Sequence, residues 1–401
     1  FNFIAIFVIS LFLIISQFNK QIINPVIFII LSFILLIYIH KRFVMDYEYN
    51  MKNEADQDDQ KKSLIPIILV LLLTLGFFVL FINLGKNDFR EDEFQVVDAA
   101  AGFTNTGKFF RWDWINDRIT DNPYQRAWPH TFLIAQSFRL FGISEFSARL
   151  ISAIFGIIFF WGFYKFSRFF SNRKVALLCL VTAILYPNYI QLFRYTRMYA
   201  LLLPVSLLVT YCLYKGIVGS LKFKAGWKAL DKFVINFLDF DYRYILLSLP
   251  LIYLNFLIHV NSLVILLGTY FFVCIMAIVE KKKKYVIIAF GGLFIGVIIL
   301  SGLLVLETSG FINYSYYLFP EFVQYLSFFK QSNYRYFAHL LNFPFGLSAG
   351  ILFFSLSGAL IYRTKIISDS LRKMIYLIVV VLTSLLFFVF IANRYESYVY
   401  I

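Results

Sequence analysis

The residues best suited to chemistry are the acids that follow the third apolar stretch of the chain. Three consecutive acids, Glu91, Asp92 and Glu93, stand just beyond the apolar stretch that ends near Leu84. A carboxylate at a membrane surface can act as a general base on a hydroxyl, or hold a divalent ion beside phosphate oxygens. A single loop acid would more often only pair with a neighbour such as Arg90, but the clustering favours chemistry. We therefore predict Asp92 and Glu93 as catalytic residues.

Cations stand at the end of a later apolar stretch on the same predicted side of the membrane. Arg194 and Arg197 are three residues apart, so one helical turn would put both on one side. Positive charge is not needed for topology there, and an arginine pair suits a phosphate through bidentate hydrogen bonds. The alternative is that both side chains reach out to lipid headgroups. We predict that Arg194 and Arg197 bind a phosphate.

Other polar side chains are predicted at this face. His259 lies between two apolar stretches and could line a cavity, although a simple polar turn fits equally well. No HxH or HExxH spacing connects the histidines, so a histidine-based metal site has little support. A divalent metal ion bound by other residues is kept as an open alternative for a cofactor. The candidate substrate-binding residues are Tyr199, Arg126, His130, His259 and Tyr395.

The composition indicates a polytopic membrane protein. The 401 residues are 60% hydrophobic and 15% charged, which is too little polar surface for a soluble protein. Backbone polar groups must be satisfied internally in lipid, so the apolar runs are predicted as helices, and the alternating pattern of a barrel is absent. The net charge of +14 is explained by basic cytoplasmic loops rather than by nucleic-acid binding. The three cysteines lie in apolar runs and indicate neither disulfides nor a metal site.

About eleven membrane spans are predicted, each close to the roughly 20 residues that cross the hydrocarbon. They lie at about 1–18, 22–39, 64–84, 146–166, 175–191, 199–216, 243–258, 262–279, 285–306, 343–361 and 373–391. With residue 1 in the cytoplasm, the cytoplasmic loops carry 23 of the 37 Lys and Arg residues, as the positive-inside rule requires. Two long loops then face outward, 86–145 and 307–342.

The first outer loop is predicted to carry surface helices. Residues 92–106 have an amphipathic pattern that Gly102 and Gly107 would end. A second, apolar helix of this loop stops at Gly142, and Ser144 can cap the span that follows. The second outer loop is rich in Tyr and Phe, which suits anchoring in the headgroup region; a wall around a lipid tail or a sugar is the alternative.

In their order along the chain, these segments resemble the GT-C glycosyltransferases. The nearest branches are the protein O-mannosyltransferases and the bacterial aminoarabinose–lipid A transferases. The resemblance rests on Asp92-Glu93-Phe94, Trp128-Pro129-His130, Leu140-Phe141-Gly142-Ile143-Ser144-Glu145-Phe146-Ser147-Ala148-Arg149-Leu150 and Arg197-Met198-Tyr199-Ala200-Leu201. It covers about residues 64 to 215, and beyond them it is topological, with Arg394-Tyr395 similar to a late Arg-Tyr of the family. The signal lies in the order and spacing of the motifs, since none is specific by itself.

The resemblance implies an inverting transferase that uses a polyprenyl-phosphate sugar at the extracytoplasmic face. Asp92 would deprotonate the acceptor hydroxyl, which belongs to a glycan, a lipid or a protein. Arg197 and Arg394 would offset charge on the departing lipid phosphate. Some relatives carry a further acid before the proline of the first loop or around Thr196, where this chain has none. That departure puts a metal site of the family type in doubt.

The predicted fold is an all-α polytopic transmembrane bundle of the GT-C type, in the cell membrane. Residues 1–63 are predicted as an accessory helical hairpin and cytoplasmic linker, and 64–401 as the catalytic domain, whose C-terminal end is expected to be incomplete. Two alternatives stay open. A lipid-linked glycan polymerase or ligase would place its chemistry in the second outer loop. A lipid-sugar transporter or flippase is less favoured, because charges are nearly absent from the middle of the spans.

Overall fold

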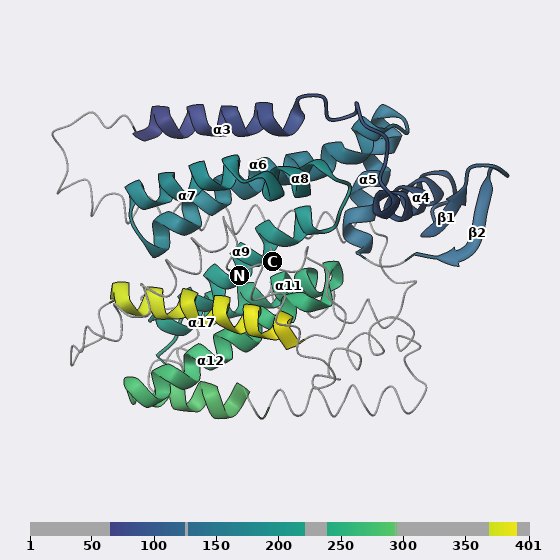
Figure 1. Cartoon of the computed structure of the whole chain (residues 1–401). Coiled ribbons are helices and arrows are strands. Elements are labelled where there is room, and N and C mark those ends of the chain that lie inside the picture. Colours follow the sequence, from purple (N-terminus) through teal and green to yellow (C-terminus); the bar gives the residue numbers. More distant parts are fainter. Residues whose placement is uncertain (1–64, 125–126, 221–238, 293, 295–368, 391–401) are drawn as a thin grey trace, which may run out of the picture. The chain divides into compact units, whose positions relative to one another are not determined.

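The protein is represented by a computed structural model, which describes residues 65–124, 127–220, 239–292, 294 and 369–390 (Figure 1). The described residues fall into two compact units. One lies within residues 1–207 and 246–259, and the other within residues 208–245 and 260–401. The candidate catalytic acids and the arginines near residue 195 all belong to the first unit.

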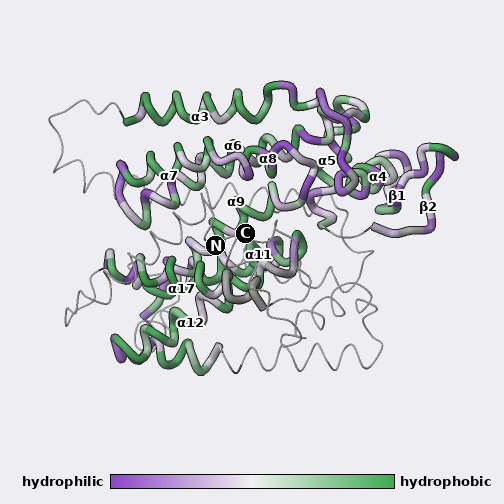
Figure 2. Tube along the Cα trace, viewed as in Figure 1, coloured by the Kyte–Doolittle hydropathy of each residue, from purple (hydrophilic) through white to green (hydrophobic). Residues whose placement is uncertain are grey.

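A layer of apolar helices makes up much of the first unit. It consists of α3 (Ile65–Phe81), α6 (Glu145–Phe170), α7 (Arg173–Leu185) and α8 (Pro187–Arg194). Apolar residues dominate α3, α6 and α7 (Figure 2). Helix α6 packs against each of the other three. A Cβ at Gly156 of α6 would lie 2.6 Å from Leu80 of α3 and 2.8 Å from Phe193 of α8, so this glycine lets both helices approach closely.

Six of the predicted spans are helices in the structure. The spans at 64–84, 146–166, 199–216, 243–258, 262–279 and 373–391 correspond to α3, α6, α9 (Tyr199–Val218), α11 (Tyr242–Ile258), α12 (Val264–Val279) and α17 (Asp369–Phe390). A short 3-10 helix, η2 (Val260–Leu263), precedes α12. Among the described residues, α6 and α9 are long and apolar enough to cross a membrane, and α7 with α8 makes a third such element if the bent pair is one span. The predicted spans 1–18, 22–39 and 343–361, the loop 307–342 and most of 285–306 lie outside the described residues.

The predicted span at 175–191 consists of two helices with a bend between them. Helix α7 ends at Leu185, α8 begins at Pro187, and the two are bent by 63°. Proline lacks a backbone N–H and disfavours the helical conformation in the residue before it. Accordingly Tyr186 is extended, with φ −77° and ψ 114°. The bend gives α8 a direction of its own and brings its last residue, Arg194, onto the end of α3.

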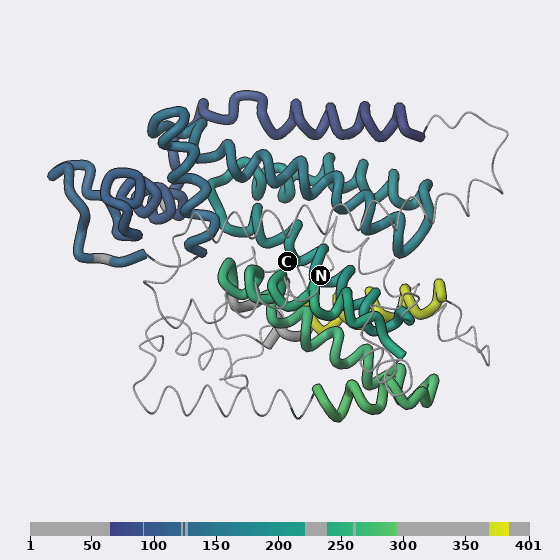
Figure 3. The backbone as a smooth tube through the Cα atoms, turned by 180° about the vertical axis from the view of Figure 1, so that it is seen from behind, coloured from purple at the N-terminus to yellow at the C-terminus, as the bar shows by residue number. Residues whose placement is uncertain are grey.

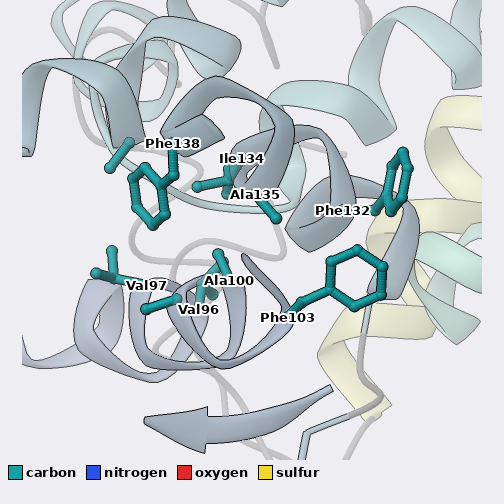
Figure 4. Close-up of a cluster of buried hydrophobic side chains, with 10 residues drawn as sticks. Val96, Val97, Ala100, Phe103, Phe132, Ile134, Ala135 and Phe138 are labelled. Carbon is teal, nitrogen blue, oxygen red and sulfur yellow. The ribbon is translucent and has the colours of Figure 1, made fainter. Parts of the chain in front are cut away.

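Two surface helices of the first outer loop pack together. Figures 1 and 3 show α4 (Glu91–Thr106) and α5 (Trp128–Phe141) from opposite sides, beyond one end of α3 and α6. The predicted amphipathic helix at 92–106 is therefore confirmed. So is its end at Gly107, whose φ of 73° and N–H bond to the carbonyl of Phe103 stop the helix. The apolar side chains between the helices include Val96, Val97, Ala100 and Phe103 of α4 and Phe132, Ile134, Ala135 and Phe138 of α5 (Figure 4).

A two-stranded hairpin that the sequence did not predict joins these helices. Strand β1 (Phe110–Asp113) pairs antiparallel with β2 (Arg118–Pro123). The Asp113 carboxylate organises the turn by accepting hydrogen bonds from the N–H groups of Ile115 and Asn116, at 3.0 and 3.2 Å. Strands this short give too few positions for an alternating pattern to stand out. Apart from the hairpin, the described chain has the predicted all-α character.

Gly102 has a different role from the predicted one. It lies inside α4 and does not end it. A Cβ at this position would collide with the carbonyl oxygen of Phe110 in β1. The absent side chain therefore allows the hairpin to lie directly on the helix.

The start of α6 is built as predicted. Gly142, with φ 77°, follows the last residue of α5. The Ser144 Oγ accepts a hydrogen bond from the N–H of Ser147 at 3.2 Å, and the Ser147 Oγ accepts one from the N–H of Ser144 at 3.0 Å. This reciprocal capping satisfies donors that the first helical turn leaves free, so α6 begins at Glu145.

In the second unit, α12 and α17 pack closely. A Cβ at Gly268 of α12 would lie 2.8 Å from the backbone of α17. The Tyr376 hydroxyl of α17 donates to the carbonyl of Thr210 in α9 at 3.0 Å. Beyond the end of α12, Glu280 accepts a hydrogen bond from Nε of Arg372 at 2.7 Å. These contacts connect α9, α12 and α17.

Replacing Gly102 by alanine tests the close approach of the hairpin to α4. Inside a helix, glycine to alanine ordinarily stabilises by about 0.8–1 kcal/mol. Here the added Cβ meets the Phe110 carbonyl, so we expect a net loss of about 1–3 kcal/mol. Gly162→Ala in α6, whose Cβ would meet nothing within 4 Å, is the matched control and should not destabilise. Thermal unfolding in detergent measures both; an unchanged midpoint for Gly102→Ala would contradict this packing.

Candidate active site

A buried ion pair between Glu93 and Arg149 forms the base of the site. Nε of Arg149 donates to Oε1 of Glu93 at 3.0 Å, and Nη2 donates to Oε2 at 2.8 Å. Glu93 is 1% exposed and Arg149 is 3% exposed. The two charges are thus withdrawn from water, and the bidentate geometry is the one that best offsets their loss of hydration.

The other N–H donors of Arg149 hold the chain segment that connects α3 to α4. Its Nη1 donates to the carbonyls of Asn87 at 2.6 Å and Leu84 at 3.3 Å, and its Nη2 donates to the carbonyl of Asp88 at 2.9 Å. The guanidinium also lies over the Phe89 ring, 5.3 Å from its centroid. One side chain of α6 therefore fixes the whole approach to α4.

The Glu93 carboxylate is equally well satisfied. Its Oε2 accepts a hydrogen bond from the N–H of Arg90 at 3.0 Å, and its Oε1 accepts one from the N–H of Thr196 at 2.8 Å. Burial disfavours the ionised form, but the hydrogen bonds from Arg149, Arg90 and Thr196 outweigh it and hold the pKa of Glu93 below its ordinary value. Glu93 is therefore an ionised structural residue that connects α4, α6 and the segment after α8.

Asp92, the preceding residue, faces outward. Its side chain is 61% exposed and forms an ion pair with Arg197, whose side chain is 30% exposed. Neighbouring residues in one helical turn point in different directions, so Glu93 is buried while Asp92 is accessible. The structure brings Asp92 and Arg197 together, and the catalytic and phosphate-binding roles predicted for them stay predictions.

Arg194 and Arg197 do not share one side of a helix, which corrects the prediction. Helix α8 ends at Arg194, and Tyr195 is extended, with φ −103° and ψ 150°. Arg194 donates from Nη1 to the carbonyl of Val79 at 2.8 Å and from Nη2 to that of Asn83 at 3.3 Å. It therefore caps the end of α3, and a phosphate role for it stays a prediction.

His130, His259 and Tyr199 are buried residues of the first unit. His130 of α5 is fully buried, with Nε2 3.3 Å from the Ser152 Oγ of α6, and burial lowers its pKa to about 3. Tyr199 and His259 are also buried, with ring centroids 5.7 Å apart. One turn before His259, the Asn255 amide donates to the Ser206 hydroxyl at 3.2 Å. The substrate-binding roles predicted for His130, Tyr199 and His259 stay predictions.

Three of the predicted site residues, Arg126, Arg394 and Tyr395, lie outside the described residues. Within the described ranges, no group of three or more His, Cys, Asp or Glu side chains could hold a metal ion. The Asp92 carboxylate has an arginine beside it, and Glu93 is saturated by donors. A divalent ion as a cofactor stays an untested prediction.

Sequence reasoning did not assign a role to Arg149, although it belongs to the motif that carries the resemblance. The available signal was an arginine near the start of the predicted span, followed by a long run of uncharged residues from Leu150 to Tyr164. A charge at such a place requires a partner or a functional reason. Its partner could not be chosen from spacing, because Glu93 lies 56 residues earlier.

The comparisons with known proteins concern fold alone. No protein-family model matches this chain, and no curated protein does. The structure of ArnT from Cupriavidus metallidurans bound to undecaprenyl phosphate covers 82% of this chain and 57% of its own, at 14% identity and a TM-score of 0.57. This chain shares the fold of ArnT.

The apo structure of ArnT from the same organism covers 84% of this chain, at 16% identity and a TM-score of 0.52. This chain spans 57% of the length of the ArnT chain in both comparisons. The predicted GT-C type of fold, similar to the aminoarabinose–lipid A transferases, is therefore confirmed, whereas the predicted number of spans is not tested.

Removing one member of the buried ion pair should strongly destabilise the protein. Arg149→Met leaves the Glu93 carboxylate buried without its cation, so we expect a loss of about 3–5 kcal/mol in the free energy of unfolding. Asp92→Asn breaks only an exposed pair and should cost less than about 1 kcal/mol. Unfolding by SDS in mixed micelles compares the two variants. Equal, small losses in both would contradict a structural role for the buried pair.

The stability that Glu93 confers should depend on pH. Its pKa in the folded protein lies below the ordinary value of 4.5, so the contribution is complete above pH 4.5. It is lost as the pH falls through the folded-state pKa, because the carboxyl is then protonated in both states. The difference in unfolding free energy between wild type and Glu93→Gln should therefore shrink below pH 4.5. A difference that grew on acidification would have the wrong sign for this ion pair.

Proposed function

We propose that this chain is a membrane glycosyltransferase that moves a sugar from a polyprenyl phosphate to an acceptor hydroxyl. The observation that carries the proposal is the ion pair between two solvent-accessible side chains, the Asp92 carboxylate and the Arg197 guanidinium. Each is the sequence neighbour of a residue that the buried contacts of Glu93 hold in place. The fold supports it, since ArnT has been solved with undecaprenyl phosphate bound. The reaction is assigned to the extracytoplasmic face of the cell membrane, where the topology rule places the loop that contains Asp92.

Asp92 is the proposed general base. As the acceptor oxygen bonds to the anomeric carbon of the sugar, its proton passes to the Asp92 carboxylate. The bond between the anomeric carbon and the phosphate oxygen breaks, and its electron pair leaves with the polyprenyl phosphate. Attack from the face opposite to the leaving group inverts the anomeric centre. A positioned carboxylate of this kind contributes about 10²–10⁴-fold to the rate.

Arg197 is the proposed phosphate ligand. Negative charge grows on the leaving phosphate as the glycosidic bond breaks, and a guanidinium in place beforehand stabilises that charge without rearrangement of solvent. Its planar fork can donate two parallel hydrogen bonds to phosphate oxygens. Arg394 would add a second cation, a role that rests on the resemblance.

Glu93 is proposed as a positioning residue rather than as a second base. A base must present a free lone pair to the substrate, and each Glu93 oxygen already accepts two hydrogen bonds within a site that is 1% exposed. With Arg149 it holds the first turn of α4 and Thr196 at fixed places. The two catalytic side chains, Asp92 and Arg197, are each the immediate neighbour of one of these fixed residues.

The experiment measures release of undecaprenyl phosphate from a panel of undecaprenyl-phosphate sugars by the purified chain, with an extract that supplies acceptors. We expect turnover by the wild type and a loss of about 10²–10⁴-fold in Asp92→Asn. The matched control is Asp98→Asn in the same helix. Its amide oxygen can still accept the 2.7 Å hydrogen bond from Nε1 of Trp114, so its turnover should equal that of the wild type.

Two outcomes would favour a different function. Equal turnover by wild type and a folded Asp92→Asn variant would remove Asp92 as the base and favour a polymerase or ligase that uses the loop 307–342. Absence of turnover with every donor, together with movement of lipid-linked sugar across vesicle membranes, would favour a transporter.

A further inference from the structure

We propose that the ion pair between Asp92 and Arg197 is an exchangeable contact: Arg197 leaves Asp92 for the donor phosphate, and the released carboxylate then receives the acceptor hydroxyl. This inference rests on the proposed function and adds an order of events to it. The donor would bind first, because its phosphate is what separates the base from its guanidinium.

The contacts between α4 and the segment after α8 form two tiers. In the inner tier, Glu93 accepts the Thr196 N–H at 2.8 Å and is buried with Arg149. In the outer tier, Asp92 pairs with Arg197 where both side chains reach solvent. Because the inner tier contains a backbone hydrogen bond, the segment stays in place when the outer tier opens. Arg197 can therefore change partner by side-chain rotation alone.

The charges favour a change of partner by Arg197 over simultaneous binding of the Asp92 carboxylate and the phosphate. Among the described residues, Arg197 is the only charged partner of Asp92, and Asp92 is the only charged partner of Arg197. A phosphodiester that approaches Arg197 brings a second negative charge next to the Asp92 carboxylate. The two anions repel each other and compete for one guanidinium. An exposed ion pair contributes little, so a bidentate phosphate contact can replace it.

Arg90 does not stand in for Arg197. Its guanidinium lies over the ring of Tyr195, 4.5 Å from the centroid, and in the described part of the chain it has no hydrogen bond to Asp92. Tyr195 is in turn held by the Gln191 amide, which donates to its hydroxyl at 2.7 Å. Among the described residues, Asp92 thus has a single cation partner, and the effect of removing that partner can be measured.

The exchange predicts that removing the carboxylate strengthens donor binding. The probe is undecaprenyl phosphate added to the full chain in nanodiscs, with undecaprenol as the uncharged comparison. Asp92→Asn should bind the phosphate about 2- to 5-fold more tightly than the wild type, the range that corresponds to one exposed ion pair. In the Arg197→Gln background the same substitution should strengthen binding less, because only the repulsion between the two anions is relieved and there is no guanidinium to release. Asp98→Asn should bind as the wild type does.

Each outcome separates the exchange from other arrangements. Unchanged or weaker binding in Asp92→Asn would mean that Arg197 bridges carboxylate and phosphate together, and would overturn the exchange. An equally large gain in the Arg197→Gln background would mean that the whole effect is repulsion between two anions, and would overturn the exchange as well. If the wild type did not prefer undecaprenyl phosphate over undecaprenol, the lipid-phosphate function itself would fall, and the exchange with it. Loss of turnover in Asp92→Asn without tighter binding would leave the function standing and remove the exchange alone.

Discussion

The buried ion pair between Glu93 and Arg149 is the constraint on which the geometry of this site depends. Two charges that are 1% and 3% exposed are tolerable only if every donor and lone pair finds a partner. The carboxylate accepts four hydrogen bonds, and the guanidinium also holds the carbonyls of Leu84, Asn87 and Asp88. Satisfying the pair therefore fixes the exit from α3, the start of α4 and the segment after α8 at the same time.

Rigidity in the inner contacts leaves the outer contacts free to act. Asp92 and Arg197 are the sequence neighbours of Glu93 and Thr196, so their backbones are held although their side chains reach solvent. A catalytic carboxylate must be fixed in position yet available to a substrate, and this arrangement meets both requirements. The cap at the start of α6 and the cap that Arg194 forms on α3 also hold the ends of these two helices in place.

The fold shared with ArnT at 14–16% identity shows that very different sequences can form it. Helix packing in lipid depends on apolar surfaces and on small residues at close contacts, and many sequences meet those requirements. Gly156 between Leu80 and Phe193, and Gly268 against α17, are contacts of this kind. The β1–β2 hairpin on Gly102 is a local addition to the helical layer, positioned by one missing Cβ.

The sequence by itself determined the membrane class, most of the described helices and the surface helix α4 with its end at Gly107. Each of these follows from local composition, periodicity or capping, which act over a few residues. Tertiary structure decided which acid was buried, which partner Arg149 found across 56 residues, and that Arg194 and Arg197 separated at the end of α8. Such pairings depend on how helices distant in the chain pack against one another, and no local pattern encodes them. The physical reason is that a buried charge selects its partner by proximity in space.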